Sequence, residues 1–153
     1  MKSSPTINLS TARLVEFVDV STLRHIEGFS RRRVLWLAKK IQREQIWTKP
    51  VVLDRAHHLA MDGQHRMEVA LMLGLAVVPA LLFDYTEVEV WSLRPSHYTV
   101  SPAEIVARAL RDDLYPYKTA KHSFPCGELP LLSIPLAHLS NRSLVGRSFE
   151  TAA

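Results

Sequence analysis

Hydrophobic and polar positions alternate along the chain with two periods, one typical of strands and one typical of helices. Residues 14–20 (LVEFVDV) are rich in β-branched and aromatic side chains, which predicts a strand. A helix is predicted to begin after Ser30, a residue type favoured at the N-cap, and Pro50 prevents it from continuing far beyond Trp47. Its apolar positions recur at helical spacing: Val34, Leu37, Ala38 and Ile41.

The middle of the chain has the pattern of a strand, a tight turn and a helix. Residues 51–53 and 59–61 are short apolar runs joined by a polar stretch, which predicts two strands with a turn between them. Asp62 and Gly63 end the second run, and Gly74 lies where a helix C-terminal cap is expected. The apolar face of the helix between them is formed by Met67, Ala70 and Leu71.

The second half continues with two strands and a helix before its pattern weakens. Residues 77–85 and 88–91 are predicted strands, and Ser101 opens a capping box for a helix that ends at Leu110. Beyond Leu114, prolines predict extended loops, and the polar residues 140–153 predict a flexible C-terminal tail. We therefore expect one α/β domain over residues 1–139.

Composition and charge narrow the class of protein. The chain has 153 residues, 47% of them hydrophobic, and a formal net charge of +4, which suits a globular domain with an anionic partner. A single cysteine, Cys126, excludes an internal disulfide and a cysteine-rich zinc site. The sequence contains no signal peptide and no apolar run long enough to span a membrane, so we expect a cytoplasmic protein.

Residues 62–66 (DGQHR) lie where the predicted strand enters the predicted helix. The first-turn amides of a helix lack internal partners, and the helix dipole favours anions there, so this turn is a candidate phosphate site. His65 and Arg66 add donors, and Arg66 can bind two phosphate oxygens at once. The alternative is purely structural: Asp62 caps the helix, and Arg66 pairs with a surface acid, Glu16 or Glu87.

The same residues carry a resemblance to a known family. Residues 61–66 (MDGQHR), the helix that follows and the VPA at 78–80 resemble the ParB/sulfiredoxin-like superfamily, which has a DGxHR-like signature in this setting. Within it, the chain is more similar to the free serine kinases, which convert L-serine to O-phospho-L-serine. The supporting stretches are HIE at 25–27, FDY at 83–85, VEVW at 88–91, and YPYKTAKH at 115–122, which is similar to their KTxRH motif with Lys121 in place of arginine.

This resemblance implies a small mixed sheet flanked by helices, and a kinase that uses ATP or ADP with Mg²⁺. It implies that Glu27 is the general base and that Asp62 binds Mg²⁺ or orients the acceptor. The residues implied in nucleotide binding are Asp62, Gly63, Gln64, His65 and Arg66. Those implied in binding the amino acid are Trp91, Lys118, Thr119, Lys121 and His122. Each has a structural alternative: an exposed loop position for Glu27, core packing for Trp91, solvated charges for Lys118 and Lys121, and a hydrogen-bonded structural role for His122.

Departures from the family pattern keep other functions open. Gln64 replaces the first histidine of the usual DGHHR, although it keeps a hydrogen-bonding side chain. Cys126 is far from the motif that carries the nucleophile of sulfiredoxins, so that activity is not expected. The main alternative is a ParB-like nucleotide-binding or DNA-associated regulator, with the arginines at 31–33 on a phosphate backbone. The proline-broken segments after Leu110 leave no helix-turn-helix, so nucleic acid is an unlikely partner. A catalytically inactive binding protein is the third possibility.

Overall fold

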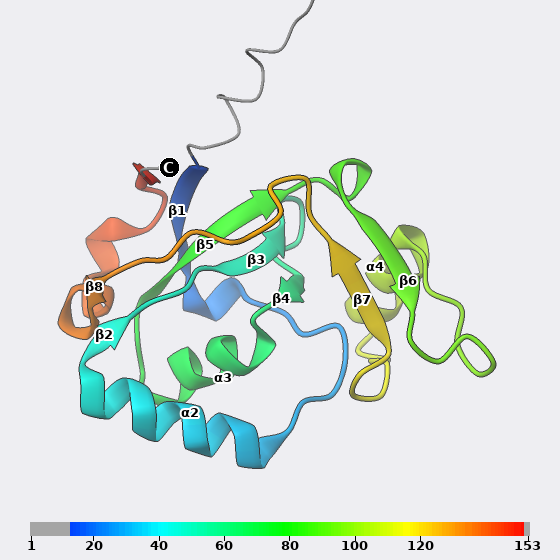
Figure 1. The fold of residues 1–153 in the computed structure, drawn as a ribbon, viewed down its shortest axis with the longest axis horizontal. Helices are drawn as coiled ribbons and strands as arrows, with labels where there is room; N and C mark the ends of the chain where they lie inside the picture. Colours follow the sequence, from blue (N-terminus) through cyan, green and yellow to red (C-terminus); the bar gives the residue numbers. More distant parts are fainter. Residues whose placement is uncertain (1–12, 152–153) are drawn as a thin grey trace, which may run out of the picture.

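The computed structural model describes residues 13–151, and a five-stranded mixed sheet forms its centre (Figure 1). The strands are β1 (Arg13–Asp19), β3 (Val51–Asp54), β4 (Ala60–Asp62), β5 (Val77–Phe83) and β9 (Ser148–Thr151), in the order β4-β3-β5-β1-β9. β3 and β5 are parallel, whereas the other neighbours are antiparallel. The predicted α/β class and the mixed sheet are therefore confirmed.

Two helices, α2 (Arg31–Glu44) and α3 (Gln64–Met72), lie together on one face of this sheet (Figure 1). Ser30 is the N-cap of α2, as predicted, and its hydroxyl accepts a hydrogen bond of 3.2 Å from the amide of Arg33. The main core between helices and sheet includes Val34, Ala38, Ile41, Met67, Val69 and Ala70. Burial of these apolar side chains holds α3 against the sheet near its edge strand, β4.

A smaller unit packs beside the main sheet (Figure 1). It consists of the antiparallel pair β6 (Glu89–Ser92) and β7 (Ala120–Ser123) with α4 (Pro102–Leu110), whose N-cap is Ser101 as predicted. Its core contains Ile26, Leu59, Ile105, Ala109 and Tyr115. The remaining elements are η1 (Val20–Thr22), β2 (Ile46–Trp47), η2 (Tyr85–Glu87), β8 (Ile134–Pro135), η3 (Leu136–Ser140) and η4 (Arg142–Leu144), with β2 and β8 paired.

The prediction of a flexible tail over residues 140–153 is wrong where the structure describes it. Residues 148–151 form β9, which pairs with β1 and completes one edge of the main sheet. The strand alternates exposed and half-buried residues, and Phe149 packs its ring against Phe17 at a centroid distance of 5.4 Å. The packing of Phe149 and the backbone hydrogen bonds to β1 therefore hold this segment in a strand, although its composition is polar.

The turn that connects β4 to α3 depends on Gly63. Asp62 was considered as a cap in the structural alternative, but the N-cap is Gly63, which has φ 88° and provides no side-chain cap. A Cβ atom on Gly63 would lie 2.9 Å from Nη2 of Arg66, and 3.1 Å from Cγ1 and 3.3 Å from Cα of Val51. The turn therefore needs a residue without a side chain, both for its left-handed backbone and for its close approach to β3.

Gly63→Ala should lower the free energy of unfolding by roughly 2 to 3 kcal/mol, because left-handed strain adds to the clash with Val51. Gly74→Ala is the matched control: Gly74 has φ 67°, but a Cβ there meets nothing within 4 Å. It should cost only about 1 kcal/mol. Urea unfolding followed by circular dichroism measures both values, and equal losses would contradict the role of the contact with Val51.

Candidate functional site

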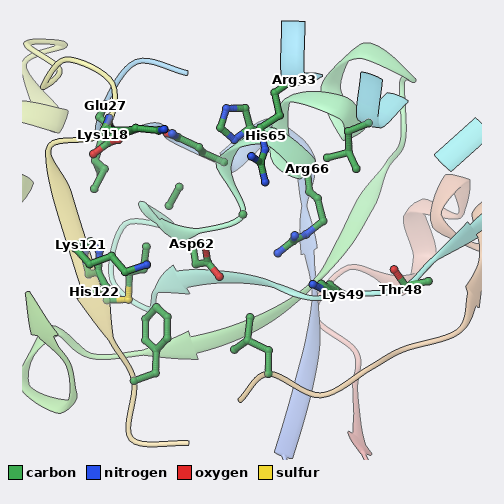
Figure 2. A pocket seen from close by; sticks show the side chains of 18 of the residues that line it. Glu27, Arg33, Thr48, Lys49, Asp62, His65, Arg66, Lys118, Lys121 and His122 are labelled. Atoms are coloured by element: carbon green, nitrogen blue, oxygen red, sulfur yellow. Dashed lines mark hydrogen bonds between the residues drawn. The ribbon is translucent and has the colours of Figure 1, made fainter. Parts of the chain in front are cut away.

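A cleft of about 800 Å³ opens where the β4–α3 turn, α2 and β7 meet. This volume lies within the range of small-molecule sites. Its charged lining side chains are the bases Arg33, Lys40, Lys49, Arg66, Lys118 and Lys121 and the acids Glu27, Glu44 and Asp62. The excess of bases gives the cleft a positive field that favours an anionic ligand. Figure 2 shows Asp62, His65 and Arg66 between Glu27 and Lys118 on one side and Thr48 and Lys49 on the other.

The N-terminus of α3 faces this cleft without a side-chain cap. Asp62, the residue before the cap, is exposed, and within residues 13–151 its carboxylate makes no hydrogen bond. The first-turn amides of the helix have no intrahelical acceptors, so the positive end of the helix dipole is available to a ligand. The proposal that Asp62 only caps the helix is therefore wrong, and its carboxylate remains available in the cleft.

Arg66 is half-buried beside this helix terminus. Its Nη2 donates to the carbonyl oxygen of Pro50 at 3.1 Å, while its Nε is buried without a partner among the described residues. Burial and the nearby Arg33 lower the pKa of Arg66, whereas Asp62 opposes that change. No ion pair joins Arg66 to Glu16 or Glu87 in the described part of the chain, so that structural alternative is wrong. A bound anion would add to the partial compensation that Asp62 gives this cation.

His65 links the starts of the two helices. The backbone amide of Ser30 donates to its Nε2 at 3.0 Å. Burial, followed by the charges of Arg33, His25 and Arg66, lowers the pKa of His65, so the ring is neutral at pH 7. Because Nε2 accepts, the proton of the neutral ring lies on Nδ1, which leaves one donor for a ligand.

Gln64 contacts the loop that carries Glu27. Its Nε2 donates to the carbonyl oxygen of Gly28 at 3.2 Å, and its Oε1 is buried without a partner among the described residues. The side chain thus ties α3 to the segment before α2. A direct contact between Gln64 and phosphate stays a prediction.

Glu27 is not an exposed loop residue, since only 6% of its surface is accessible. Its Oε2 accepts from the amide of Lys118 at 2.7 Å, and its Oε1 accepts from the amides of Thr119 at 3.3 Å and Ala120 at 2.9 Å. A carboxylate offers about four acceptor positions, so one position on Oε2 is left. Glu27 therefore holds the segment before β7 in place and still presents one acceptor site at the cleft.

The amino-acid-binding residues implied by the resemblance separate into two groups. Lys118, Lys121 and His122 line the cleft, whereas Trp91 and Thr119 do not. Thr119 is fully buried, and its hydroxyl donates to the carbonyl oxygen of Pro116 at 2.6 Å. Trp91 is 45% exposed, which also excludes core packing. Trp91 pairs with Lys121 in the β6–β7 register, so both lie on the face of the pair opposite His122, yet of these two only Lys121 lines the cleft.

His122 is buried against Tyr85, whose hydroxyl oxygen lies 3.1 Å from its Nε2. Burial, with a smaller effect of Lys121, lowers the pKa of His122 to about 4. The ring is therefore neutral at pH 7 and acts as a hydrogen-bonded structural histidine. Its contact with a substrate remains a prediction.

The lining residues Trp36, Lys40 and Lys49 were missed in the sequence, and Arg33 was considered there only as part of a cluster that could contact DNA. Arg33, Trp36 and Lys40 are spaced by three and four residues, which places them on one face of α2 beside its buried stripe. Trp36 is 63% exposed, an unusual amount for an indole, and helical spacing alone could have grouped it with the two bases. Lys49 precedes Pro50, and its carbonyl oxygen accepts a hydrogen bond of 2.6 Å from Trp47 Nε1.

The residues present fit a magnesium ion that is bound chiefly through phosphate. Within residues 13–151, no group of three or more histidine, cysteine, aspartate or glutamate side chains could hold a metal by itself. Mg²⁺ commonly uses one or two carboxylates together with phosphate oxygens and water. The exposed carboxylate of Asp62, which makes no hydrogen bond among the described residues, suits that need.

Comparisons with known proteins agree with this fold. No protein-family model matches the chain. A ParB-like protein of Sulfolobus acidocaldarius is 31% identical over 62 residues, which span 40% of this chain but only 31% of that protein. C-terminally truncated SbnI from Staphylococcus aureus superposes with TM-score 0.73 at 14% identity, over 83% of this chain and 89% of that structure.

A free serine kinase in complex with AMP superposes with TM-score 0.72 at 12% identity, over 83% of this chain and 94% of that structure. Variants of that kinase with one glutamate replaced have been solved with AMP and with ADP. The chain therefore has the ParB/sulfiredoxin-like fold, in the form that SbnI and free serine kinase share.

Within residues 13–151, no helix is long and apolar enough to cross a membrane.

The lowered pKa of His122 predicts a loss of stability in acid. The unfolded chain takes up a proton at this histidine near pH 6.5 and the folded chain only near pH 4, so stability is full above pH 6.5 and falls as the pH drops towards 4. The loss attributable to His122 should reach roughly 3 kcal/mol.

His122→Gln should reduce the difference in unfolding free energy between pH 7 and pH 4.5, measured by urea unfolding. His97→Gln, a change at an exposed histidine, serves as the control and should leave the difference as it is in the parent protein. An undiminished difference in His122→Gln would show that His122 does not cause the acid sensitivity.

Proposed function

We propose that this protein is a small-molecule kinase that transfers a phosphoryl group from ATP or ADP to the hydroxyl of free L-serine, forming O-phospho-L-serine. The observation that carries the proposal is the uncapped N-terminus of α3 at the centre of a basic cleft, with Asp62 and the half-buried Arg66 beside it. The shared fold with a free serine kinase that binds AMP and ADP supports it.

In this proposal, the phosphates of the nucleotide bind at the start of α3. The amides of its first turn, the Nδ1 proton of His65 and the guanidinium of Arg66 together provide neutral and charged donors for phosphate oxygens. Arg33 and Lys49 line the same cleft and add positive charge. Asp62 would hold Mg²⁺, which would supply further neutralisation of the phosphate charge.

The two ends of the cleft suit the two substrates. Trp36 offers an exposed indole on which adenine can stack, between the bases of α2. At the other end lie Glu27, Lys118 and Lys121, where two ammonium groups suit the carboxylate of an amino acid. The free acceptor position on Glu27 Oε2 can take the proton of the serine hydroxyl as phosphoryl transfer proceeds.

The other predicted acceptor residues act less directly in this proposal. The amide of Thr119 donates a hydrogen bond to Glu27. The ring of His122 holds β7 against Tyr85. Leu93 lines the cleft and can provide the apolar wall that the resemblance assigns to Trp91. The extra methyl of threonine changes affinity by roughly 1 to 3 kcal/mol, so discrimination between the two amino acids has to be measured.

Product formation tests the function directly. The protein is incubated with Mg²⁺, ATP or ADP, and serine, threonine or other hydroxy compounds, and phosphorylated products are measured by mass spectrometry. O-phosphoserine is the expected product. Asp62→Asn should lower kcat by at least about 100-fold, because charge stabilisation of the transferred phosphoryl group is lost.

The matched control for that variant is Asp112→Asn, at an exposed aspartate that follows α4. Asp112 has a positive φ of 56°, which asparagine also tolerates, so the change should not strain the backbone. It should retain full activity. Absence of any phosphorylated hydroxy compound with either nucleotide would rule out the proposed function.

The proposed adenine site gives a separate prediction. Trp36→Ala should raise the nucleotide Kd about tenfold, since stacking of a base on an aromatic ring contributes about 1 to 3 kcal/mol. Trp91→Ala removes another exposed indole, outside the cleft, and should leave the nucleotide Kd unchanged. Isothermal titration calorimetry with ATP, ADP and Mg²⁺ measures both, and similar changes in the two variants would contradict a base site on α2.

A further inference from the structure

The amides of Lys118, Thr119 and Ala120 form a carboxylate-binding site that Glu27 occupies. All three donate to the Glu27 carboxylate, and the site lies where the backbone enters β7. Lys118 has φ 61°, and a left-handed residue within such a run turns successive amides towards one concave side. This local geometry is typical of backbone sites that bind anions.

The same site is within reach of a ligand. Glu27, Lys118 and Ala120 line the cleft, together with the side chain of Lys121. The proposed acceptor brings a carboxylate of its own, which is chemically equivalent to the one already bound. An incoming carboxylate can therefore remake the hydrogen bonds that Glu27 gives up, and the ammonium groups of Lys118 and Lys121 compensate the added negative charge.

The arrangement also bears on the role of Glu27 as a base. Three backbone amides already occupy acceptor positions of its carboxylate. While it is bound in this way, only one acceptor position on Oε2 is left. A base that is freed at the moment the acceptor binds would regain all of its acceptor positions.

We propose that the α-carboxylate of the amino acid displaces the Glu27 carboxylate from the amides of residues 118–120, and that the displaced Glu27 then becomes the general base. The proton passes from the serine hydroxyl to Glu27, the oxygen forms a bond to the transferred phosphorus, and the bond to the remaining nucleotide breaks. The catalytic part of this inference rests on the proposed kinase function, whereas the exchange itself needs only a carboxylate ligand.

One consequence is protection of the nucleotide. Without an amino acid, Glu27 stays on the amides and does not activate water, so hydrolysis of bound nucleotide is slow. L-alanine has the carboxylate but no hydroxyl, so it should release Glu27 without offering an acceptor. L-alaninamide has neither group and should leave Glu27 where it is.

The test uses the full chain with ¹³C at the glutamate carboxyl carbons, with the Glu27 signal assigned by its loss in Glu27→Gln. L-alanine is expected to shift the Glu27 signal while that of Glu150, at the far edge of the sheet, stays fixed; L-alaninamide is expected to shift neither. L-alanine should also raise the rate of nucleotide hydrolysis several-fold, and this increase should be absent in Glu27→Gln.

An unmoved Glu27 signal at saturating L-alanine would overturn the exchange, even if the protein phosphorylates serine. A shift produced equally by L-alaninamide would overturn it as well, because the carboxylate would then not be the cause. A shift specific to L-alanine in a protein that phosphorylates no hydroxy compound would support the carboxylate site while refuting the kinase.

Discussion

The left-handed turn at Gly63 is the constraint on which the rest of the site depends. It lets the chain leave β4 and enter α3 within one residue, in close contact with Val51 of β3. The start of the helix then opens into the cleft with no side chain capping it. Asp62 and Arg66 take their positions on either side of the turn as a consequence. A larger residue at 63 would press against Arg66 and Val51.

Long-range hydrogen bonds assemble the other half of the site around this turn. His65 accepts from Ser30 at the start of α2, and Gln64 donates to Gly28. Glu27 in turn accepts from the segment before β7. Three parts of the chain that are far apart in sequence are thus held together by polar contacts near one helix terminus. Such contacts are directional, so they set the relative positions of donors and acceptors more closely than apolar packing does.

Much of the fold was predictable from local pattern, because N-caps, β-branched runs and glycines at turns act over a few residues. Ser30 and Ser101 were correctly placed as N-caps, and the DGQHR turn was located. The strand at 148–151 was missed, because its order comes from pairing with β1, at the other end of the chain. For the same reason, the sequence could not reveal which acceptor residues face the cleft. Trp91 lies outside the cleft although its partner Lys121 lines it, and Thr119 is fully buried with its hydroxyl bonded to Pro116, and neither outcome is visible in composition.

The central claim is that a nucleotide polyphosphate binds at the start of α3. It is tested most directly by nuclear magnetic resonance of the ¹⁵N-labelled protein, titrated with ATP or ADP and Mg²⁺. The account predicts that the amide signals of Gln64, His65 and Arg66 shift most, in a saturable manner. Saturable shifts centred elsewhere, for instance on the exposed arginines 31 and 32, or no binding of either nucleotide, would contradict it.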